Sequence, residues 1–567
     1  MTRARSGAGR LTVWNIGNTT VRNPERLAPG LQVFADHMNG RTWDLDAQER
    51  LWAMLLKAGL IVSESENERA SLGRKWFAAF KQLGFVHLDD LNAARLTAVG
   101  WEVLNHPELI DLIFLRQLLK YKLGSPVERT RTDGLEFRPF VVLLKLLHMA
   151  HVGGLGGLTR DELMIFVIPL MSEDQAELEL AFEKIKIFRD AYSKQVGMVN
   201  KRAFAAAEFK RLAPATPSST TFSDYTDSNM RYARMSELIT IDSNGGRFKL
   251  SPARLAIAES ILAALPPIVP DADYLDALHN PASPRLPLDD ETTLDAQITQ
   301  FEAEITALSS APPTVSTANA TVAALQSRER QLRSRVTELT EIKFYRNQRS
   351  FESLQQIKEL LIMIKKRELP AGMSYAPAFM EWAMWRLMLA INTISNPISE
   401  TRGFKIDDDI VPLGHAVGGA ADCLFEYEDH LVAVEVTLSR GRRQTGMEGE
   451  PVRFHVADVM DTYPTKTVYG LFVAPQVDVN ICDEFYSAAF RVDGKRLHRP
   501  AIVPLAIDDV IALIDAMIAQ NFIITSDQML RLLDELQALR KTTADGLEWK
   551  EQVTQVFNDR LTTLTAI

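Results

Sequence analysis

The sequence predicts a multidomain α+β protein with a mostly helical N-terminal region, a helical linker and a C-terminal α/β domain. Three observations predict this fold class. Amphipathic helical patterns dominate residues 1–270. Proline, alanine, serine and threonine are concentrated at 266–320, ahead of a long charged helical pattern. From residue 369 onward, short apolar runs alternate with helical patterns. We therefore place three domains at 1–270, 271–368 and 369–567.

The N-terminal region contains two similar arrangements of predicted elements. Apolar residues recur at helical spacing in three of its segments, at 51–61, 140–152 and 255–265. Residues 74–104 and 231–262 each indicate a helix, a short two-stranded hairpin and a following helix, with a tight turn expected at 243–246 in the second. This order is typical of a winged helix. It also suits a helical module that makes no contact with nucleic acid.

The middle of the chain is expected to separate two folded parts. The Pro-rich segment 266–320 is predicted to lack regular structure, except for a helix at 292–308. Residues 322–366 indicate a solvated spacer helix or a pair of helices, with a binding device as the alternative. In the C-terminal domain we expect a helix over 381–394 and four strands, at 421–428, 431–438, 467–475 and 501–507.

Composition excludes several classes of protein. The net charge of −10 and the pI of about 5.6 exclude a histone-like protein held to nucleic acid by bulk charge, although a local basic groove remains possible. Two cysteines, Cys423 and Cys482, are too few for a disulfide framework or a Cys-rich zinc site. The N-terminus lacks an apolar signal core, and no apolar run is long enough to span a membrane. We expect a soluble, cytoplasmic protein.

Acidic residues mark the first two strands predicted for the C-terminal domain. Asp422 begins one strand, and Glu435 lies within the next, on the strand face that also carries Thr437. A carboxylate in such apolar surroundings needs a cation or a donor. Two carboxylates on antiparallel neighbours suit Mg²⁺, which prefers oxygen ligands and keeps several waters. Glu448, thirteen positions beyond Glu435, is a candidate third ligand, and His455 follows seven positions later.

On spacing alone, each of these residues also has an ordinary structural explanation. Glu435 would pair with a nearby arginine, Arg440 or Arg442. Asp422 would simply start a strand, and Glu448 would be solvated in a polar loop. A lone histidine is commonly structural.

The segment 418–455 resembles the core of PD-(D/E)XK nucleases, in which two acids on adjacent strands hold the metal and a lysine assists the attacking water. Ala421 stands where proline usually precedes the aspartate, and Thr437, a hydrogen-bond donor but too weak a base, stands at the lysine position. The phrases WNIGNTTVRNPERLAPGL (14–31) and EGEPVRFHVADV (448–459) resemble those of the AlwI-type restriction endonucleases. That family includes Type IIS and strand-specific nicking enzymes, and its members accept the missing lysine.

This resemblance implies a PD-(D/E)XK-like nuclease domain at 369–567 with a catalytic set of five residues: Asp422, Glu435, Glu448, His455 and, from the preceding helix, Glu381. Asp422 and Glu435 would bind Mg²⁺, and Glu448 would complete the site or bind a second ion. Glu381 would hold a water of the site. His455 would position or deprotonate the attacking water in place of the lysine.

Sequence recognition would lie in residues 1–270, by resemblance to the family and in accord with the winged-helix pattern. Arginine grips guanine O6 and N7 with two hydrogen bonds, whereas lysine mostly supplies charge to phosphates. Candidate DNA contacts are basic residues near the first family phrase or before the two hairpins: Arg22, Arg26, Arg74, Lys75, Arg231 and Arg234. Asn15, Asn18 and Asn23 would read adenine or, as we prefer, cap local turns.

We therefore interpret the sequence as a Type IIS enzyme of a restriction–modification system. It would hydrolyse double-stranded DNA at a fixed offset from a short asymmetric site. One such nuclease site cuts one strand, so the enzyme is a nickase unless a transient homodimer or a small partner subunit cuts the second strand. Two alternatives stay open. One is a non-catalytic winged-helix regulator with a degenerate nuclease-like dimerisation domain, and the other is a repair nuclease without sequence specificity.

Overall fold

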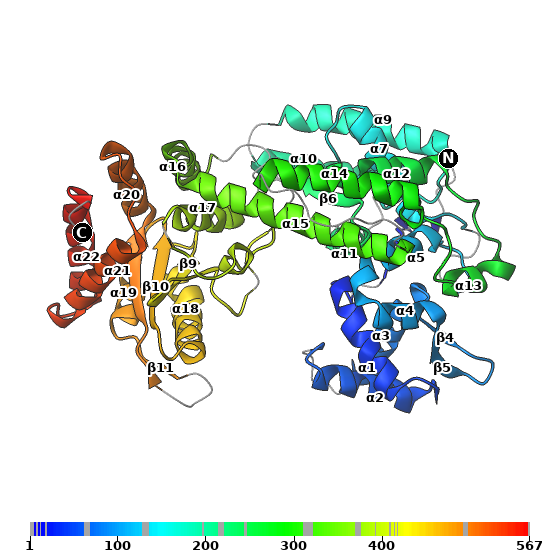
Figure 1. Ribbon diagram of the computed structural model, residues 1–567, viewed down its shortest axis with the longest axis horizontal. Coiled ribbons are helices and arrows are strands. Elements are labelled where there is room, and N and C mark those ends of the chain that lie inside the picture. The colour runs from blue at the N-terminus through cyan, green and yellow to red at the C-terminus, as the bar shows by residue number, and fades with distance from the viewer. Residues whose placement is uncertain are drawn as a thin grey trace. The chain divides into compact units, whose positions relative to one another are not determined.

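The computed structural model describes residues 5–6, 10–11, 13–17, 20–61, 68–127, 135–195, 198–213, 220–242, 247–309, 321–368, 376–391, 393–406, 410–412, 414–416, 418–491 and 497–564. These residues form two compact units (Figure 1). Unit 1 contains the described residues up to Ile298 and those from 321 to Glu329. Unit 2 contains those from Thr299 to Ser309 and from Arg330 onward. The residues predicted as a linker, 271–368, thus contribute to both units.

The N-terminal part of unit 1 is a helical module with a small sheet. Its elements are β1 (Arg5–Ser6), β2 (Arg10–Leu11), η1 (Pro24–Arg26), α1 (Leu27–His37), β3 (Arg41–Thr42), α2 (Leu45–Lys57), α3 (Arg69–Gln82), β4 (Val86–Leu88), β5 (Ala93–Leu96) and α4 (Ala98–Asn105). Strands β3, β5 and β4 form an antiparallel sheet in that order. Asp44 and Thr97 cap α2 and α4 with their side-chain oxygens. The predicted helix, hairpin and helix over 74–104 are confirmed by α3, β4, β5 and α4.

The rest of unit 1 contains the second hairpin. Its elements are η3 (Pro107–Leu109), α5 (Ile110–Lys120), α7 (Pro139–Val152), α8 (Arg160–Glu162), η4 (Leu163–Val167), α9 (Gln175–Ser193), α10 (Met198–Leu212), α11 (Thr220–Arg234), β6 (Ile239–Asp242), β7 (Arg247–Leu250), η5 (Pro252–Arg254) and α12 (Leu255–Ala263). The antiparallel pair β6–β7 between α11 and α12 confirms the second predicted hairpin. The turn expected at 243–246 lies outside the described residues. Helices α2, α7 and α12 form at the three segments with helical spacing.

The N-terminal phrase of the family resemblance packs on α11. The backbone N–H of Ile16 donates to Asn229 Oδ1 (2.6 Å), and Asn229 Nδ2 donates to the carbonyl of Trp14 (3.1 Å). The buried hydroxyl of Tyr232 donates to the carbonyl of Val21 (2.9 Å). Breaking these bonds would leave buried polar groups without partners, which costs free energy of folding. The bonds therefore hold the phrase in place within unit 1, and its role there is structural.

Gly17 in this phrase has φ +71°, and a Cβ there would lie 2.3 Å from Cζ of Tyr232. We expect Gly17→Ala to lower the free energy of unfolding by about 2–5 kcal/mol, because it adds a steric clash to the strain of a positive φ. Gly59→Ala is the matched control, since Gly59 also has φ +71° but has no described atom within 4 Å of the Cβ position. It should cost only about 1–2 kcal/mol. Denaturant unfolding compares the two variants, and equal losses would contradict the packing role of Gly17.

The prediction that 266–320 lacks regular structure outside 292–308 was wrong for 271–279 and 287–289, and residues 310–320 lie outside the described part of the chain. The elements in this stretch are α13 (Asp271–His279), η6 (Pro287–Asp289) and α14 (Glu291–Ser309). Tyr274 and Leu278 of α13 are buried, and Lys122 Nζ lies 3.0 Å from Asp271 Oδ1. Prolines flank α13 without interrupting it, so tertiary packing stabilises a helix that composition alone did not reveal. The helix expected at 292–308 is confirmed by α14.

The charged stretch 322–366 forms a pair of helices, one of the two arrangements expected. These are α15 (Val322–Gln348) and α16 (Phe351–Lys366). Ser350 caps α16 by accepting a hydrogen bond from the backbone N–H of Ser353. The pair is not purely solvated, because Glu329 of α15 forms an ion pair with Arg254 (3.0 Å) in which both side chains are almost fully buried.

Unit 2 is built around a four-stranded sheet. Its remaining elements are α17 (Ala376–Ala390), η7 (Ile398–Thr401), β8 (Cys423–Glu426), β9 (His430–Val436), α18 (Arg442–Thr462), β10 (Thr467–Ala474), α19 (Val479–Tyr486), β11 (Phe490–Arg491), β12 (Leu497–His498), β13 (Ala501–Ala506), α20 (Ile507–Ala519), α21 (Ser526–Ala538), η9 (Leu539–Lys541) and α22 (Gly546–Leu561). The sheet order is β13-β10-β9-β8, with β8 antiparallel to β9 and the other neighbours parallel. The predicted helix 381–394 is confirmed over 381–390, and the four predicted strands are confirmed.

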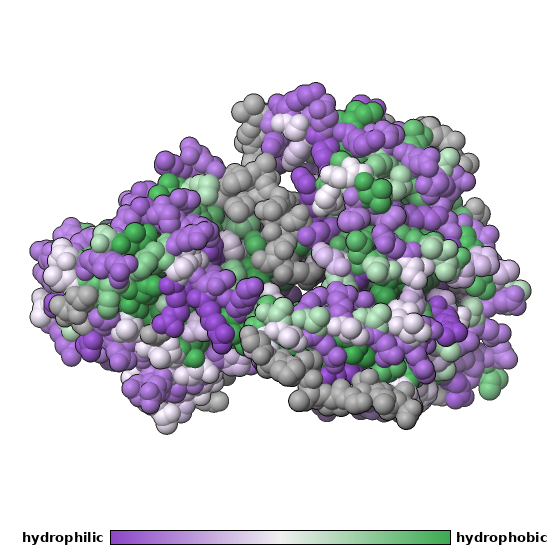
Figure 2. Space-filling view, turned by 45° about the horizontal axis from the view of Figure 1, so that its top comes forward, coloured by the Kyte–Doolittle hydropathy of each residue, from purple (hydrophilic) through white to green (hydrophobic). Residues whose placement is uncertain are grey.

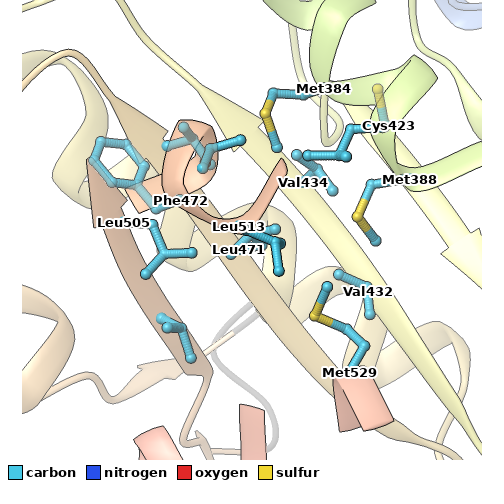
Figure 3. Packing of buried hydrophobic residues seen from close by; sticks show 14 of the residues in the cluster. Met384, Met388, Cys423, Val432, Val434, Leu471, Phe472, Leu505, Leu513 and Met529 are labelled. Atoms are coloured by element: carbon cyan, nitrogen blue, oxygen red, sulfur yellow. The ribbon is translucent and has the colours of Figure 1, made fainter. Parts of the chain in front are cut away.

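One face of this sheet forms the core of unit 2. Val432 and Val434 of β9 lie with Met384 and Met388 of α17 and Met529 of α21 in one buried cluster (Figure 3). The flexible methionine side chains fill the irregular space between the sheet and these helices. The core therefore fixes α17 against the sheet.

The opposite face of the sheet is covered by α18. Gly470 of β10 permits this close packing, because a Cβ there would lie 2.8 Å from a methyl group of Val456. Glu435 and Thr437 alternate with the valines of β9, so their side chains point to the face that α18 covers.

The residues after β9 form a helix where a polar loop was considered. α18 includes both Glu448 and His455, and it carries Pro451 in its interior. Proline lacks an N–H group and usually breaks helices, which is why this run indicated a loop. The buried side chains of Val452 and Val456 supply the packing that overrides the local preference.

No helix in the described part of the chain is long and apolar enough to cross a membrane. On the face drawn in Figure 2, hydrophilic residues are interspersed with smaller hydrophobic patches. The most exposed large hydrophobic side chains among the described residues are Leu91 (82%), Val152 (71%) and Ile187 (69%).

Candidate active site

Two carboxylates meet across the first two strands of the unit 2 sheet. In the antiparallel pairing of β8 with β9, Cys423 lies opposite Val434, so Asp422 lies opposite Glu435. Asp422 Oδ2 accepts a hydrogen bond from the backbone N–H of Val436 (2.8 Å). Glu435 is only 6% exposed. The structure thus brings the two predicted acids together.

Helix α18 adds two side chains to this pair. Glu448 and His455 are seven residues apart, or about two helical turns, so they lie on one face of α18. His455 Nδ1 lies 2.7 Å from Glu435 Oε1. Thr437 Oγ1 donates a hydrogen bond to Glu448 Oε1 (2.7 Å). Glu435 therefore pairs with a histidine of α18, and not with the neighbouring arginines considered from the sequence.

Glu381, near the start of α17, is the fifth predicted residue at this place. Its Oε2 accepts a hydrogen bond from the backbone N–H of Ala416 (2.7 Å), and the residue is 5% exposed. The negative charges of Asp422 and Glu435 act on its carboxyl group. All five residues of the predicted catalytic set thus lie in one neighbourhood of unit 2.

Burial shifts the titration of this cluster. Burial, reinforced by the charge of Asp422, raises the pKa of Glu381 to about 8. Burial also raises the pKa of Asp422 to about 6, opposed by the Val436 N–H, and raises the pKa of Glu435 well above its ordinary value. The pKa of His455 is lowered, mainly by burial. Like charges gathered away from water favour protonation unless a cation joins them.

The donor set fits a hard divalent cation. Mg²⁺ prefers carboxylate oxygens and commonly binds through one or two carboxylates while it keeps several waters. Structural and catalytic zinc sites take three or four protein ligands, usually nitrogen or sulfur. Among the described residues, no three His, Cys, Asp or Glu side chains form a ready-made metal-binding group. Asp422 and Glu435 supply the two carboxylates that a magnesium site needs.

A comparison with protein families matches residues 81–513 to the AlwI restriction endonucleases. The chain belongs to the AlwI restriction endonuclease family. This confirms the resemblance inferred from the sequence phrases. Membership of a restriction endonuclease family makes the chain a DNA-cleaving hydrolase, and the acidic cluster of unit 2 lies within the matched residues.

Two solved structures show limited similarity to this family member. One is the small subunit, R.BspD6I2, of the heterodimeric restriction endonuclease R.BspD6I, with 21% identity and a TM-score of 0.29 over 36% of this chain and 97% of that chain. The other is the BpuJ1 endonuclease binding domain in complex with pyrene- and phenanthrene-modified DNA, with 14% identity and a TM-score of 0.34 over 45% and 86% of the two chains. No curated protein matches the chain.

The residues predicted to contact DNA in this AlwI family member differ in whether their side chains have partners within the structure. Arg22 pairs with Asp224 (2.9 Å). Arg231 pairs with Asp227 (3.0 Å). Lys75 and Arg234 also have partners. Arg26 and Arg74 are exposed, and within the described residues neither side chain makes a hydrogen bond or an ion pair.

The asparagines of the first family phrase cap local turns, the role we preferred. Asn15 Nδ2 donates to the carbonyl of Gly17 (2.9 Å). Asn23 Oδ1 accepts from the backbone N–H of Glu25 (3.2 Å) and caps η1. Asn18 lies outside the described residues.

Two contributors to the site were missed by sequence reasoning. The backbone of Ala416 donates to Glu381, and the charge of His415 lowers the pKa of Asp422. Both belong to an irregular segment, which carries no periodic signal. The histidine next to a Gly-rich run was the only available indication, and it is weak.

Proposed function

We propose that the chain is a Mg²⁺-dependent Type IIS restriction endonuclease with a PD-(D/E)XK-like nuclease core in unit 2. It would hydrolyse double-stranded DNA at a fixed offset from a short asymmetric site, one strand for each active site. The observation that carries the proposal is the convergence of Asp422 and Glu435 of the sheet with Glu448 and His455 of α18, which covers that sheet face.

In this proposal Asp422 and Glu435 hold Mg²⁺, and Glu448 completes the site. When bound, the ion polarises the scissile phosphate and lowers the pKa of the attacking water. Thr437 fixes Glu448 through their 2.7 Å hydrogen bond, which is a positioning role. This supports the expectation that the threonine is a donor within the site and does not replace the lysine as a base.

His455 is proposed to accept the proton of the attacking water. Its Nδ1 faces Glu435, which fixes the ring and leaves Nε2 as the nitrogen that can accept a proton. The lowered pKa keeps the imidazole neutral near neutral pH. Glu381, whose Oε2 accepts from the Ala416 N–H, is proposed to hold a water of the site with its carboxyl group.

Recognition is proposed to lie in unit 1. The order α1, β3, α2, α3, β4, β5 and the sheet β3-β5-β4 support a winged helix, with α3 as the helix that enters the major groove. Arg74 and Ala78 are exposed on α3, one turn apart, and Lys81 continues the same face half-buried. The two basic side chains of this face, Arg74 and Lys81, suit phosphates and guanine edges.

Arg74→Ala is expected to weaken binding to the cognate duplex by about 5- to 150-fold, which corresponds to one lost two-pronged arginine contact. Arg231→Ala is the contrasting variant, because Asp227 already engages that arginine. We expect it to change binding by less than about threefold. Fluorescence anisotropy with labelled duplexes measures both. The reverse order of effects would move recognition from α3 to α11.

The number of cut strands follows from the number of active sites. The described residues of each chain hold one such acidic cluster, so a single chain is proposed to nick. Cleavage of both strands would require a transient homodimer or a small partner subunit. The oligomeric state on DNA with two sites, measured by mass photometry, distinguishes these cases.

The test of the proposed function is cleavage of supercoiled plasmid with Mg²⁺ and with EDTA, followed by run-off sequencing of the products. Discrete ends at one distance from a shared short sequence are expected with Mg²⁺ only. Scattered ends would indicate a nuclease without sequence specificity. Specific binding without cleavage would favour the non-catalytic regulator, the alternative that Ala421 and Thr437 suggested.

A further inference from the structure

Three arginines without partners in the described part of the chain lie between the end of β9 and the first turn of α18, in the segment 438–443 that we call the arginine loop. Arg440, Arg442 and Arg443 are all exposed, and within the described residues none of the three makes an ion pair or a hydrogen bond through its side chain. Elsewhere in unit 2, many basic side chains have carboxylate partners, as in Lys358–Asp515, Lys365–Asp508, Arg402–Glu341, Arg453–Glu484, Lys466–Glu426 and Arg560–Glu535. Three adjacent unpaired guanidinium groups form a concentrated positive charge.

This arginine loop is held in a defined position. Gln444, which is fully buried, donates through Nε2 to the carbonyls of Ser439 (3.0 Å) and Gln476 (3.1 Å). Its Oε1 accepts from the backbone N–H of Asp478 (2.8 Å). Gly441 turns the chain with φ +58°. The arginines therefore extend from an anchored backbone, which lowers the entropy lost when they bind a ligand.

The loop also adjoins the acidic cluster. It begins directly after Thr437, whose Oγ1 accepts from the backbone N–H of Ser439 (3.0 Å) and donates to Glu448 (2.7 Å). At its other end it becomes the first turn of α18, where the helix dipole favours an anion. A polyanion whose scissile phosphate reached Asp422 would pass close to these arginines.

We propose that Arg440, Arg442 and Arg443 bind the backbone phosphates that flank the scissile phosphate, and thereby position the cut strand over the acidic cluster. The inference rests on the proposed function. Its physical basis is charge: a site lined by carboxylates repels DNA, and Thr437 supplies no cation where the nuclease core usually has a lysine. Guanidinium groups match phosphate geometry with paired donors. These are positioning residues, because they touch phosphates on either side of the reacting one.

The test compares the unchanged full-length chain with the triple variant Arg440→Ala/Arg442→Ala/Arg443→Ala. The substrate is a duplex that contains the site found by run-off sequencing, with Mg²⁺ present. Each lost phosphate contact lowers the slope of log affinity against log salt by about 0.9, so we expect the slope to fall by about 2 to 3. The KM for cleavage should rise steeply with salt in the unchanged chain and less in the variant. Replacing all three arginines by lysine should restore most of the slope, because lysine keeps the charge.

Arg499→Ala is the matched control. Arg499 is also exposed in unit 2, but it precedes β13 and so lies at the amino end of the parallel strands. The arginine loop follows β9 and lies at their carboxyl end. Its loss should leave the salt slope unchanged. Equal slopes for the unchanged chain and the triple variant, with cleavage intact, would overturn the arginine proposal and leave the proposed function standing. Failure of the unchanged chain to cleave would overturn the proposed function and this inference with it.

A second measurement locates the loop on DNA. Both native cysteines, Cys423 and Cys482, are buried, so a cysteine introduced by Arg442→Cys can carry an iron chelate that generates hydroxyl radicals. Strand breaks within a few nucleotides of the cut position support the proposal. Breaks confined to the recognition sequence, or a pattern equal to that of Arg499→Cys, would contradict it.

Discussion

Asp422→Asn is expected to abolish cleavage while DNA binding stays unchanged. Asparagine has the same shape, and its side-chain oxygen can still accept the hydrogen bond from the Val436 N–H that Asp422 now accepts. The fold around β8 should therefore survive. Only the negative charge disappears, and with it one of the two proposed ligands of Mg²⁺. We expect the single-turnover rate to fall by at least about 10³-fold, because ligand loss removes charge stabilisation at the scissile phosphate.

Glu428→Gln is the matched control for this variant, since Glu428 is an exposed carboxylate in the turn of the same β8–β9 hairpin. It should cleave at the normal rate. Anisotropy with the cognate duplex reports binding, which unit 1 should supply in both variants. EDTA should reproduce the effect of Asp422→Asn on the unchanged chain. Cleavage by Asp422→Asn within tenfold of normal would refute the ligand assignment.

The strand pair that carries these acids was predictable because its signal is local. Alternation of valines with Ala433, Glu435 and Thr437 fixed the faces of β9, and the short acidic turn before it indicated an antiparallel neighbour. These two facts made Asp422 the natural companion of Glu435, and the register of the β8–β9 pair places it directly opposite. The pairing of His455 with Glu435 was not predictable in this way, because it depends on how α18 packs on the sheet.

Two elements escaped prediction for the same physical reason. The proline of α18 and the prolines around α13 lower local helix propensity, while tertiary packing of Val456 and Tyr274 outweighs that loss. Packing between distant segments has no local sequence signal. Glu381 lies 41 positions before Asp422, and only the family resemblance selected it from the other acids of the chain.

His455→Ala is expected to slow single-turnover cleavage by about 10²- to 10⁴-fold, the usual contribution of general-base assistance. DNA binding should not change, because the ring lies beneath α18 against Glu435. Thr437→Val should cost much less, since it removes a positioning hydrogen bond and no proton acceptor. Exogenous imidazole, which fits the space left by the ring, should restore part of the rate of His455→Ala.

The pH dependence of the cleavage rate distinguishes a general base from a residue that only supports Glu435. A base works when deprotonated, so the rate should rise with pH through the pKa of His455 and level off above it. Because burial lowers that pKa, we expect this rise below pH 6.5. His455→Ala should flatten this limb. A histidine that only holds Glu435 in place predicts otherwise: the alanine variant would bind Mg²⁺ more weakly, excess Mg²⁺ would restore its rate, and imidazole would not. An unchanged pH profile in His455→Ala, together with rescue by Mg²⁺, would therefore reassign His455 to the support of Glu435.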